Sequence, residues 1–341
     1  MRPQLLAHAL RQHGLVTRLQ ALQSGYTEGD VRAQTRTTGS WHTVRRGVYV
    51  ERALWSQLDR DERGRREIFA VLLLAQQPLY SSHGSSALIA ALPMLESSRA
   101  LIHMTAPRIN GGRTEHGVKY HSATIEEMDT VRTPFGPATG LARTVCDIAR
   151  EDGYLPGLVV ADAALRRDVE RADLERVAAG MKHWPGVTNV RAVVRDADRG
   201  AENPGETLFR AVLARLGWGA PRLQVAIREG GRSAYVDAML GAHAFEFDGR
   251  VKYARSRPYA DGRLPEDVLF EEKRREDWLR AQSEVEGLSR ATWDEVWTEV
   301  WRTDEGPLLR RLRADVEATI KRIGLPAWMA SLGGALRPAD R

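Results

Sequence analysis

A short turn at Gly241-Ala242 separates two segments of alternating polar and apolar residues, so the sequence predicts a β-hairpin. In this hairpin Asp237 is opposite Glu246, and Asp248 lies two residues farther along the same face. Opposed carboxylates repel each other, and a divalent cation removes the repulsion because hard cations bind clustered oxygen ligands. The sequence therefore predicts that Asp237, Glu246 and Asp248 bind Mg²⁺ or Mn²⁺.

A divalent metal in such a site activates water and stabilises the charge of a phosphodiester transition state. Lys252 follows the third carboxylate closely, and we expect it to add positive charge to that transition state. The alternative is a polar sheet face without a metal, on which basic residues of the next predicted helix (265–281) neutralise the carboxylates. Those basic residues are Lys273, Arg275 and Arg280.

The predicted hairpin needs further elements to hold it. An amphipathic helix is expected over residues 206–216, with Glu206 at its start and its leucines inward. Strands are expected at 222–227, 234–240 and 243–248. In the last strand Phe245 and Phe247 face away from the carboxylates, into a core. The turn-rich segment 196–205 before these elements is the predicted hinge between domains.

The positive charge of the chain is concentrated at its beginning. Residues 1–50 hold seven arginines and two acidic residues, 7 − 2 = +5, which equals the net charge of the whole chain. Helices are predicted near residues 3–13, after Thr17 and after Thr27, followed by two short strands around Arg46-Gly47. Three short helices and a β-wing indicate a winged helix-turn-helix, and the charge favours DNA as its partner. The alternative is a winged helix that binds only protein.

Six residues of this first module are the expected DNA contacts. Side chains of the third helix suit the major groove, and those of the wing suit phosphates or the minor groove. The set comprises Arg32, Gln34 and Arg36 on the helix, and His42, Arg45 and Arg46 on the wing.

The middle of the chain reads as a mixed α/β scaffold without a recognisable catalytic motif. Its histidines His83, His103, His116 and His121 are far apart in the sequence, and we expect each to be structural. The single Cys146 has apolar neighbours and is expected in a core, which is typical of a reducing cytoplasm. No apolar run has membrane-spanning length, and the N-terminal residues lack a secretory pattern.

The C-terminal motifs resemble a known nuclease-like family. NPGETLFR, Gln224, YVDAML, FEFDGRVKY and EEKRREDWLR, within residues 200–297, are similar to relatives of the very-short-patch-repair endonucleases in the PD-(D/E)xK superfamily. The resemblance implies that Glu206, Asp237 and Glu246 are the acidic active-site residues and Gln224 the polar residue of the preceding strand. Asp248 stands where the superfamily usually has lysine, and Lys252 is a candidate for that lysine in a shifted position.

The first part has a different relative. The segment from GLVTRLQALQ to RRGVYV resembles the winged-helix domain of abortive-infection type IV toxin–antitoxin antitoxins, and the tract from SSHGSSALIAALPML to TGLARTVCDIAR resembles the domain that follows it. Such antitoxins repress their own operons through the winged helix. The resemblance therefore implies DNA as a partner, with a cognate toxin as a further one.

The sequence predicts a mixed, multidomain α+β chain. Its expected domains are a winged helix-turn-helix at 1–58, an α/β middle domain at 59–198, a restriction-endonuclease-like α/β domain at 199–300, and a C-terminal helix and tail at 301–341. Three functions stay open: a metal-dependent DNA endonuclease, an antitoxin-like transcriptional repressor with an inactive nuclease fold, and a protein-interaction scaffold.

Overall fold

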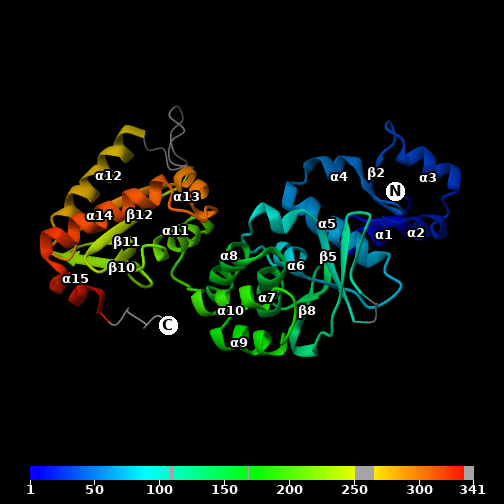
Figure 1. Cartoon of the computed structure of the whole chain (residues 1–341). Helices are drawn as coiled ribbons and strands as arrows, with labels where there is room; N and C mark the ends of the chain where they lie inside the picture. The colour runs from blue at the N-terminus through cyan, green and yellow to red at the C-terminus, as the bar shows by residue number, and fades with distance from the viewer. Residues whose placement is uncertain (108–110, 168, 250–264, 334–341) are drawn as a thin grey trace. The chain divides into compact units, whose positions relative to one another are not determined.

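The computed structural model describes residues 1–107, 111–167, 169–249 and 265–333 (Figure 1). It divides into two compact units, Met1–Ala197 and Asp198–Arg341. The boundary falls within the turn-rich segment predicted as the hinge. The chain is a mixture of helices and several sheets, as expected for a mixed α+β chain.

The first unit begins with three helices and a small three-stranded sheet of order β1-β3-β2. Thr17 and Thr27 cap the second and third helices, and each forms a reciprocal capping box with the residue three positions later. Both caps were predicted from the sequence. The elements are α1 (Pro3–Arg11), β1 (Val16–Thr17), α2 (Arg18–Gln23), α3 (Glu28–Thr35), β2 (Trp41–Arg45) and β3 (Val48–Glu51).

The rest of the first unit is a six-stranded sheet of order β6-β7-β5-β4-β9-β8 with helices packed on it. The strands are β4 (Tyr80–Ser81), β5 (Ile102–Ala106), β6 (Arg113–Glu115), β7 (Val118–Ser122), β8 (Thr130–Thr133) and β9 (Gly136–Thr139). The helices are α4 (Arg52–Gln57), α5 (Arg60–Leu73), α6 (His83–Ile89), α7 (Leu141–Asp152), α8 (Tyr154–Leu165), α9 (Arg171–Gly180) and α10 (Val187–Asp196), with short 3₁₀ turns at Glu96–Arg99 and Glu127–Asp129.

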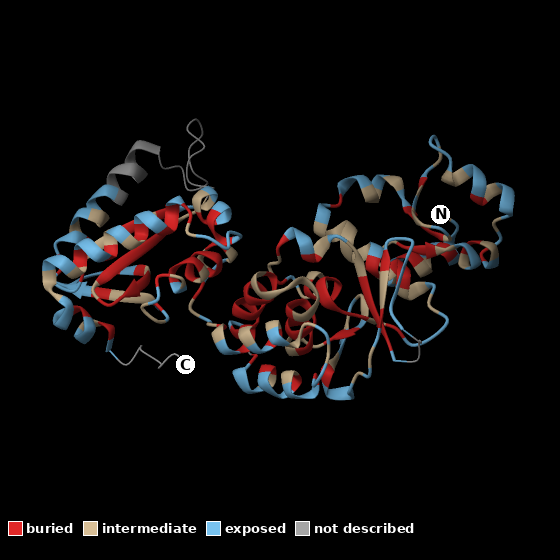
Figure 2. Cartoon of the chain, viewed as in Figure 1, coloured by how far each residue is buried: buried red, intermediate tan, exposed pale blue. Residues whose placement is uncertain are grey.

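Helices α7 and α8 form the buried centre of this unit, as Figure 2 shows. Ten of the twelve residues of α8 are buried, all but Asp162 of them non-polar, so this helix is enclosed by its neighbours. Cys146 of α7 is fully buried, which confirms the predicted core position. Burial raises the pKa of its thiol, so it stays protonated at neutral pH.

The second unit is a four-stranded sheet of order β10-β11-β12-β13, in which β12 and β13 are parallel and the other pairs antiparallel. The strands are β10 (Arg222–Glu229), β11 (Arg232–Leu240), β12 (His243–Asp248) and β13 (Gly287–Thr292). The helices are α11 (Pro204–Ala214), α12 (Pro265–Arg280), α13 (Trp293–Val300), α14 (Pro307–Ile323) and α15 (Leu325–Leu332). Helices α14 and α15, in the region 301–341 for which the sequence predicted a C-terminal helix and tail, belong to this unit.

The sheet of the second unit has helices on both faces. On one face, Phe245 and Phe247 contact Phe209 of α11, as the predicted alternation required. On the other face, Met239 and Ala244 pack with Leu279 of α12. The carboxylates of β12 alternate with the phenylalanines and therefore lie on the α12 face.

Within the described residues, no helix combines the length and the apolar character needed to cross a membrane.

Candidate functional site

The hairpin around Gly241-Ala242 has the predicted register. Leu240 pairs with His243, and Met239 pairs with Ala244. The described ladder between β11 and β12 then ends at the next pair, Ala238 and Phe245, one position before the two predicted carboxylates would be opposed. The two strands are no longer paired beyond this point. The carboxylates of Asp237 and Glu246, which would repel each other, are therefore not directly opposed.

Where the ladder ends, the side chain of Asp237 accepts a hydrogen bond from the backbone of β12. The backbone N–H of Phe247 donates to Oδ2 of Asp237 over 2.8 Å. Gln224, which continues the β10 register opposite Asp237, has a left-handed φ of 47°. This conformation is uncommon for a residue with a side chain and interrupts the β10 ladder at the same level of the sheet. Both strands beside Asp237 are therefore locally irregular.

Glu246 is buried, with 4% of its surface exposed, and is paired with two arginines. Nη1 of Arg275 from α12 lies 2.7 Å from its Oε1, and Nη2 of Arg290 from β13 lies 2.8 Å from its Oε2. Arg290 is the register partner of Glu246 on the neighbouring parallel strand. Arg275 is one of the basic residues that the sequence led us to expect beside the carboxylates of this sheet face.

Glu206 lies in the first turn of α11 and approaches the same region. Its Oε2 accepts from the backbone N–H of Glu202 over 2.7 Å and from Nε2 of Gln224 over 3.4 Å. Burial raises the pKa of the Glu206 carboxyl, and the charge of Asp237 raises it further. The structure therefore brings Glu206, Gln224 and Asp237 together.

The other predicted members of the acidic site are placed differently. Asp248, at the end of β12, pairs in register with Thr292, and its charge acts on Arg290. Lys252 lies outside the described residues. The described Asp and Glu side chains form no group of three whose ligand atoms all lie within 4.8 Å. The predicted metal site would therefore require side-chain rearrangement, beginning with the arginines on Glu246.

Two of the three predicted DNA contacts on the third helix are exposed to solvent. Arg32 is exposed on α3, and Arg36 is exposed at the end of that helix. Gln34 is half-buried and accepts a hydrogen bond from the hydroxyl of Ser40, which ties it to the loop before β2. Two cationic side chains are thus available for a partner on this face.

The wing residues divide into exposed and engaged side chains. Arg46 is exposed in the turn between β2 and β3. His42 stacks on Trp55 of α4, with ring centroids 4.7 Å apart, and burial together with Arg52 lowers its pKa. Arg45 donates to the backbone carbonyl of His116 over 2.9 Å. His42 and Arg45 therefore pack against the rest of the first unit, because the β2–β3 hairpin contacts α4, α5 and the β6–β7 turn.

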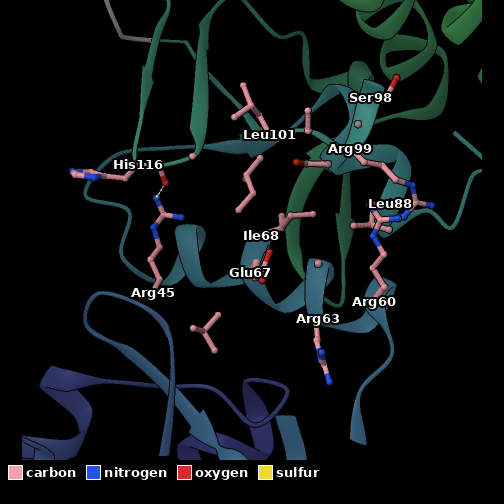
Figure 3. Close-up of a pocket in the computed structure, with 17 residues that line it drawn as sticks. Arg45, Arg60, Arg63, Glu67, Ile68, Leu88, Ser98, Arg99, Leu101 and His116 are labelled. Carbon is pink, nitrogen blue, oxygen red and sulfur yellow. Dashed lines mark hydrogen bonds between the residues drawn. The ribbon is translucent and has the colours of Figure 1, made fainter. Parts of the chain in front are cut away.

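Arg45 also lines a pocket of about 570 Å³ between the β2–β3 hairpin, α5 and the six-stranded sheet (Figure 3). Three more arginines contribute to its wall, and each has protein partners. Arg60 pairs with Glu96, Arg99 pairs with Asp61, and Arg63 donates to the carbonyl of Trp55. The remaining labelled lining residues are Glu67, Ile68, Leu88, Ser98, Leu101 and His116.

Three of the four histidines that were each expected to be structural, although far apart in the sequence, form one buried cluster. His83, His103 and His121 are 1%, 4% and 8% exposed, and one ring nitrogen of each lies within 4.8 Å of the others. Nδ1 of His103 and Nε2 of His121 are 3.0 Å apart, and the rings of His83 and His121 stack with centroids 3.9 Å apart. His116 is exposed and outside the cluster.

Burial keeps the clustered histidines neutral. It lowers the pKa of His103 to about 4 and that of His121 to about 3, and it lowers the pKa of His83 strongly. Neighbouring histidines reinforce the effect at His83 and His121, since adjacent positive charges repel. At neutral pH each ring therefore keeps one nitrogen lone pair.

The sequence contained only a weak signal for this cluster. His103 and His121 lie on parallel neighbours β5 and β7, where His121 is the register partner of Thr105, two residues after His103. His83 follows β4, the other neighbour of β5, within the buried serine-rich run 81–86. The strand order that joins them is non-local, so sequence spacing alone does not reveal it.

Comparison with protein-family models, with curated proteins and with solved structures finds no match for this chain.

Proposed function

We propose that this chain is a DNA-binding protein whose N-terminal module acts as a winged helix-turn-helix and whose second unit carries a nuclease-like centre for Mg²⁺ or Mn²⁺. The observation that carries the proposal is the meeting of Glu206, Gln224 and Asp237 at the point where β11 parts from β12. Carboxylate and amide oxygens at a break in a sheet are suited to a hard divalent cation.

The chemistry of the proposed centre is phosphodiester hydrolysis. Asp237 and Glu206 would hold the metal, which supplies an activated water and stabilises charge on the phosphate. Glu246 would join them when Arg275 or Arg290 releases it, and a released guanidinium is a suitable partner for a phosphate oxygen. Asp248 and Lys252 remain proposed as a further ligand and as an assisting cation.

The DNA-binding part of the proposal is supported by charge and exposure. The first fifty residues hold the +5 excess, seven arginines against two acidic residues, and Arg32, Arg36 and Arg46 are exposed there. Such a basic face binds the phosphate backbone and loses affinity as salt is added. His42 and Arg45 are less suited to direct contact, because both are engaged within the unit.

A repressor without nuclease activity is the second candidate, and one observation favours it. Glu246 is already neutralised by two arginines, so this carboxylate needs no metal to balance its charge. The protein would then resemble the abortive-infection antitoxins in function, acting in the cytoplasm on its own operon and binding a cognate toxin. Its nuclease-like unit would serve binding or stability.

The two candidates are separated by one cleavage assay. Purified protein is incubated with plasmid DNA and Mg²⁺ or Mn²⁺, with the Asp237→Ala variant in parallel. Metal-dependent nicking by the wild type that is absent from the variant supports the nuclease. Tight, salt-sensitive binding without cleavage of duplex or single-stranded DNA supports the repressor.

Gel shifts test the DNA contacts themselves. Arg32→Ala and Arg36→Ala should each weaken binding by about 1–3 kcal/mol if the side chains reach base edges. Arg45→Ala is the matched control, because its guanidinium is held by the His116 carbonyl and should affect affinity much less. Equal affinities for the wild type and the two helix variants would reject α3 as the recognition helix.

A further inference from the structure

We propose that His83, His103 and His121 form a second metal site, in the first unit, for a transition-metal ion that prefers imidazole, with Zn²⁺ the leading candidate. It is separate from the carboxylate centre of the second unit in both location and ligand chemistry. Imidazole nitrogen suits Zn²⁺, Ni²⁺ and Cu²⁺, whereas Mg²⁺ and Mn²⁺ prefer oxygen.

The spacing of the ring nitrogens is close to what such an ion needs. Two nitrogens bound to one tetrahedral Zn²⁺ at about 2.0–2.1 Å lie roughly 3.3–3.4 Å apart. Nδ1 of His103 and Nε2 of His121 are 3.0 Å apart, so a small separation of the two rings admits the ion in place of their shared proton. The third nitrogen, from His83, lies within 4.8 Å of both.

His83 is the ligand that must move most, and its backbone is fixed. Its ring stacks on that of His121 at an interplanar angle of 17°, so it has to turn about its Cβ–Cγ bond for its lone pair to converge. The backbone holds His83 at a left-handed φ of 49° at the start of α6. The next residue, Gly84, has no room for a Cβ atom beside the carbonyl oxygen of Ser98. The chain thus places His83 against the other two rings at the cost of local strain.

The surrounding hydroxyl groups can orient the ligands. Nδ1 of His83 lies 3.0 Å from Oγ of Ser82, which also accepts from the hydroxyl of Thr105 over 2.8 Å. Ser85 accepts from the backbone N–H of His103 over 2.8 Å. The Ser82 hydroxyl contacts a ring nitrogen and is therefore the partner that can fix the tautomer and ring orientation of a metal-binding histidine, whereas Ser85 anchors the backbone of His103.

The positive charge of Arg150 would repel a metal ion bound by the three histidines, and its removal is therefore a test of the site. Nη2 of Arg150 is 3.4 Å from Nε2 of His83, and two other nearby cations, Lys119 and Arg143, are paired with Glu151 and Asp147. Arg150 is therefore the cation whose charge a bound divalent ion would meet most directly. Removing it should tighten metal binding, an outcome that a purely structural histidine cluster does not predict.

The experiment is equilibrium dialysis of full-length protein against Zn²⁺, with bound metal measured by mass spectrometry. All variants carry Asp237→Asn, so that the proposed carboxylate centre does not contribute. His103→Gln and His121→Gln each remove one ligand, and His116→Gln, at an exposed histidine outside the cluster, is the matched control. Visible absorption of the Co²⁺-substituted protein reports nitrogen coordination independently.

One equivalent of Zn²⁺ is expected in the control, and affinity should fall by about 100-fold or more in either ligand variant, since even the partners of metal ligands change affinity by 10–100-fold. Equal binding in all variants, or no binding in the control, overturns the proposal.

Arg150→Gln covers the case in which a ligand variant does not fold, because it keeps all three imidazoles. Its affinity for Zn²⁺ should rise by about tenfold or more when the neighbouring charge is removed. An unchanged or lower affinity in folded Arg150→Gln protein also overturns the proposal.

Discussion

The two polar centres of this molecule tolerate burial in opposite ways. In the first unit, His83, His103 and His121 are buried without charge, because burial lowers their pKa values. In the second unit, Glu246 is buried and is balanced by two arginines. A histidine has an unperturbed pKa near neutrality, so it can be buried in its neutral form at little cost. A carboxylate is charged at neutral pH and is more readily buried in an ion pair.

This difference predicts how each centre responds to a change in its surroundings. The histidine cluster should be sensitive to protons and to metals that bind nitrogen, and indifferent to the loss of distant charges. The carboxylate centre should be sensitive to the loss of either ionic partner. Three measurements test the comparison, from the largest expected effect to the smallest.

Acidification should destabilise the first unit most. An unfolded chain protonates each histidine near pH 6.5, but folded His103 and His121 resist protonation down to about pH 4 and 3. Between these values the unfolded state binds more protons, so stability is lost as pH falls from about 6.5 to 4. Each histidine contributes up to about 1.4 kcal/mol per pH unit in this window, several kcal/mol in total.

Calorimetry between pH 7.5 and 4.5 measures this effect. The second unit has one comparable histidine, His243, whose pKa burial lowers to about 4, so its transition should shift less. His116→Gln is the control variant, at an exposed histidine outside the cluster. A second-unit transition that falls faster than the first on acidification would break the comparison.

Glu246→Gln should destabilise the second unit by about 3 kcal/mol, since it leaves Arg275 and Arg290 facing a neutral amide. Urea unfolding measures the loss, and the variant also identifies which thermal transition belongs to the second unit. Glu276→Gln is the control, because Glu276 contacts the same Arg290 at 3.3 Å from the helix surface and should cost less than about 1 kcal/mol. Equal effects of the two variants would contradict a special role for the buried carboxylate.

Asp237 should have the smallest effect on stability. Asp237→Ala removes the acceptor for the Phe247 N–H and should cost about 1 kcal/mol, whereas Asp237→Asn retains an acceptor oxygen and should be nearly neutral. Thermal melts with and without Mn²⁺ complete the test. Both variants should lose any metal-induced rise in melting temperature, and a full rise in Asp237→Asn would exclude this carboxylate as a required ligand.

The features predicted correctly from the sequence are local ones. The N-caps at Thr17 and Thr27 depend on the first turn of the helix that each residue precedes, and the register of the β11–β12 hairpin follows from its two-residue turn. Each of these signals is complete within about ten residues, so propensity and turn chemistry suffice.

The features that the sequence did not predict depend on distant segments. Arg290 reaches Glu246 because β13 joins β12 in parallel, 44 positions along the chain by the register Glu246–Arg290. The histidines meet because β5 lies between β4 and β7 in the sheet. The turn alone also did not reveal that the β11–β12 ladder ends at Ala238 and Phe245, before Asp237 and Glu246 are paired. Non-local pairing has no local sequence signature.

The register pairing of Glu246 with Arg290 has a consequence for the evolution of the chain. An uncompensated charge left in this interior is costly, so a substitution at one position favours a second substitution at the other. Among homologues, positions 246 and 290 should therefore covary, with a neutral residue at 246 accompanied by loss of the arginine at 290. Lineages that keep the acid but lose the arginine would be those in which another cation, such as a bound metal, has replaced it.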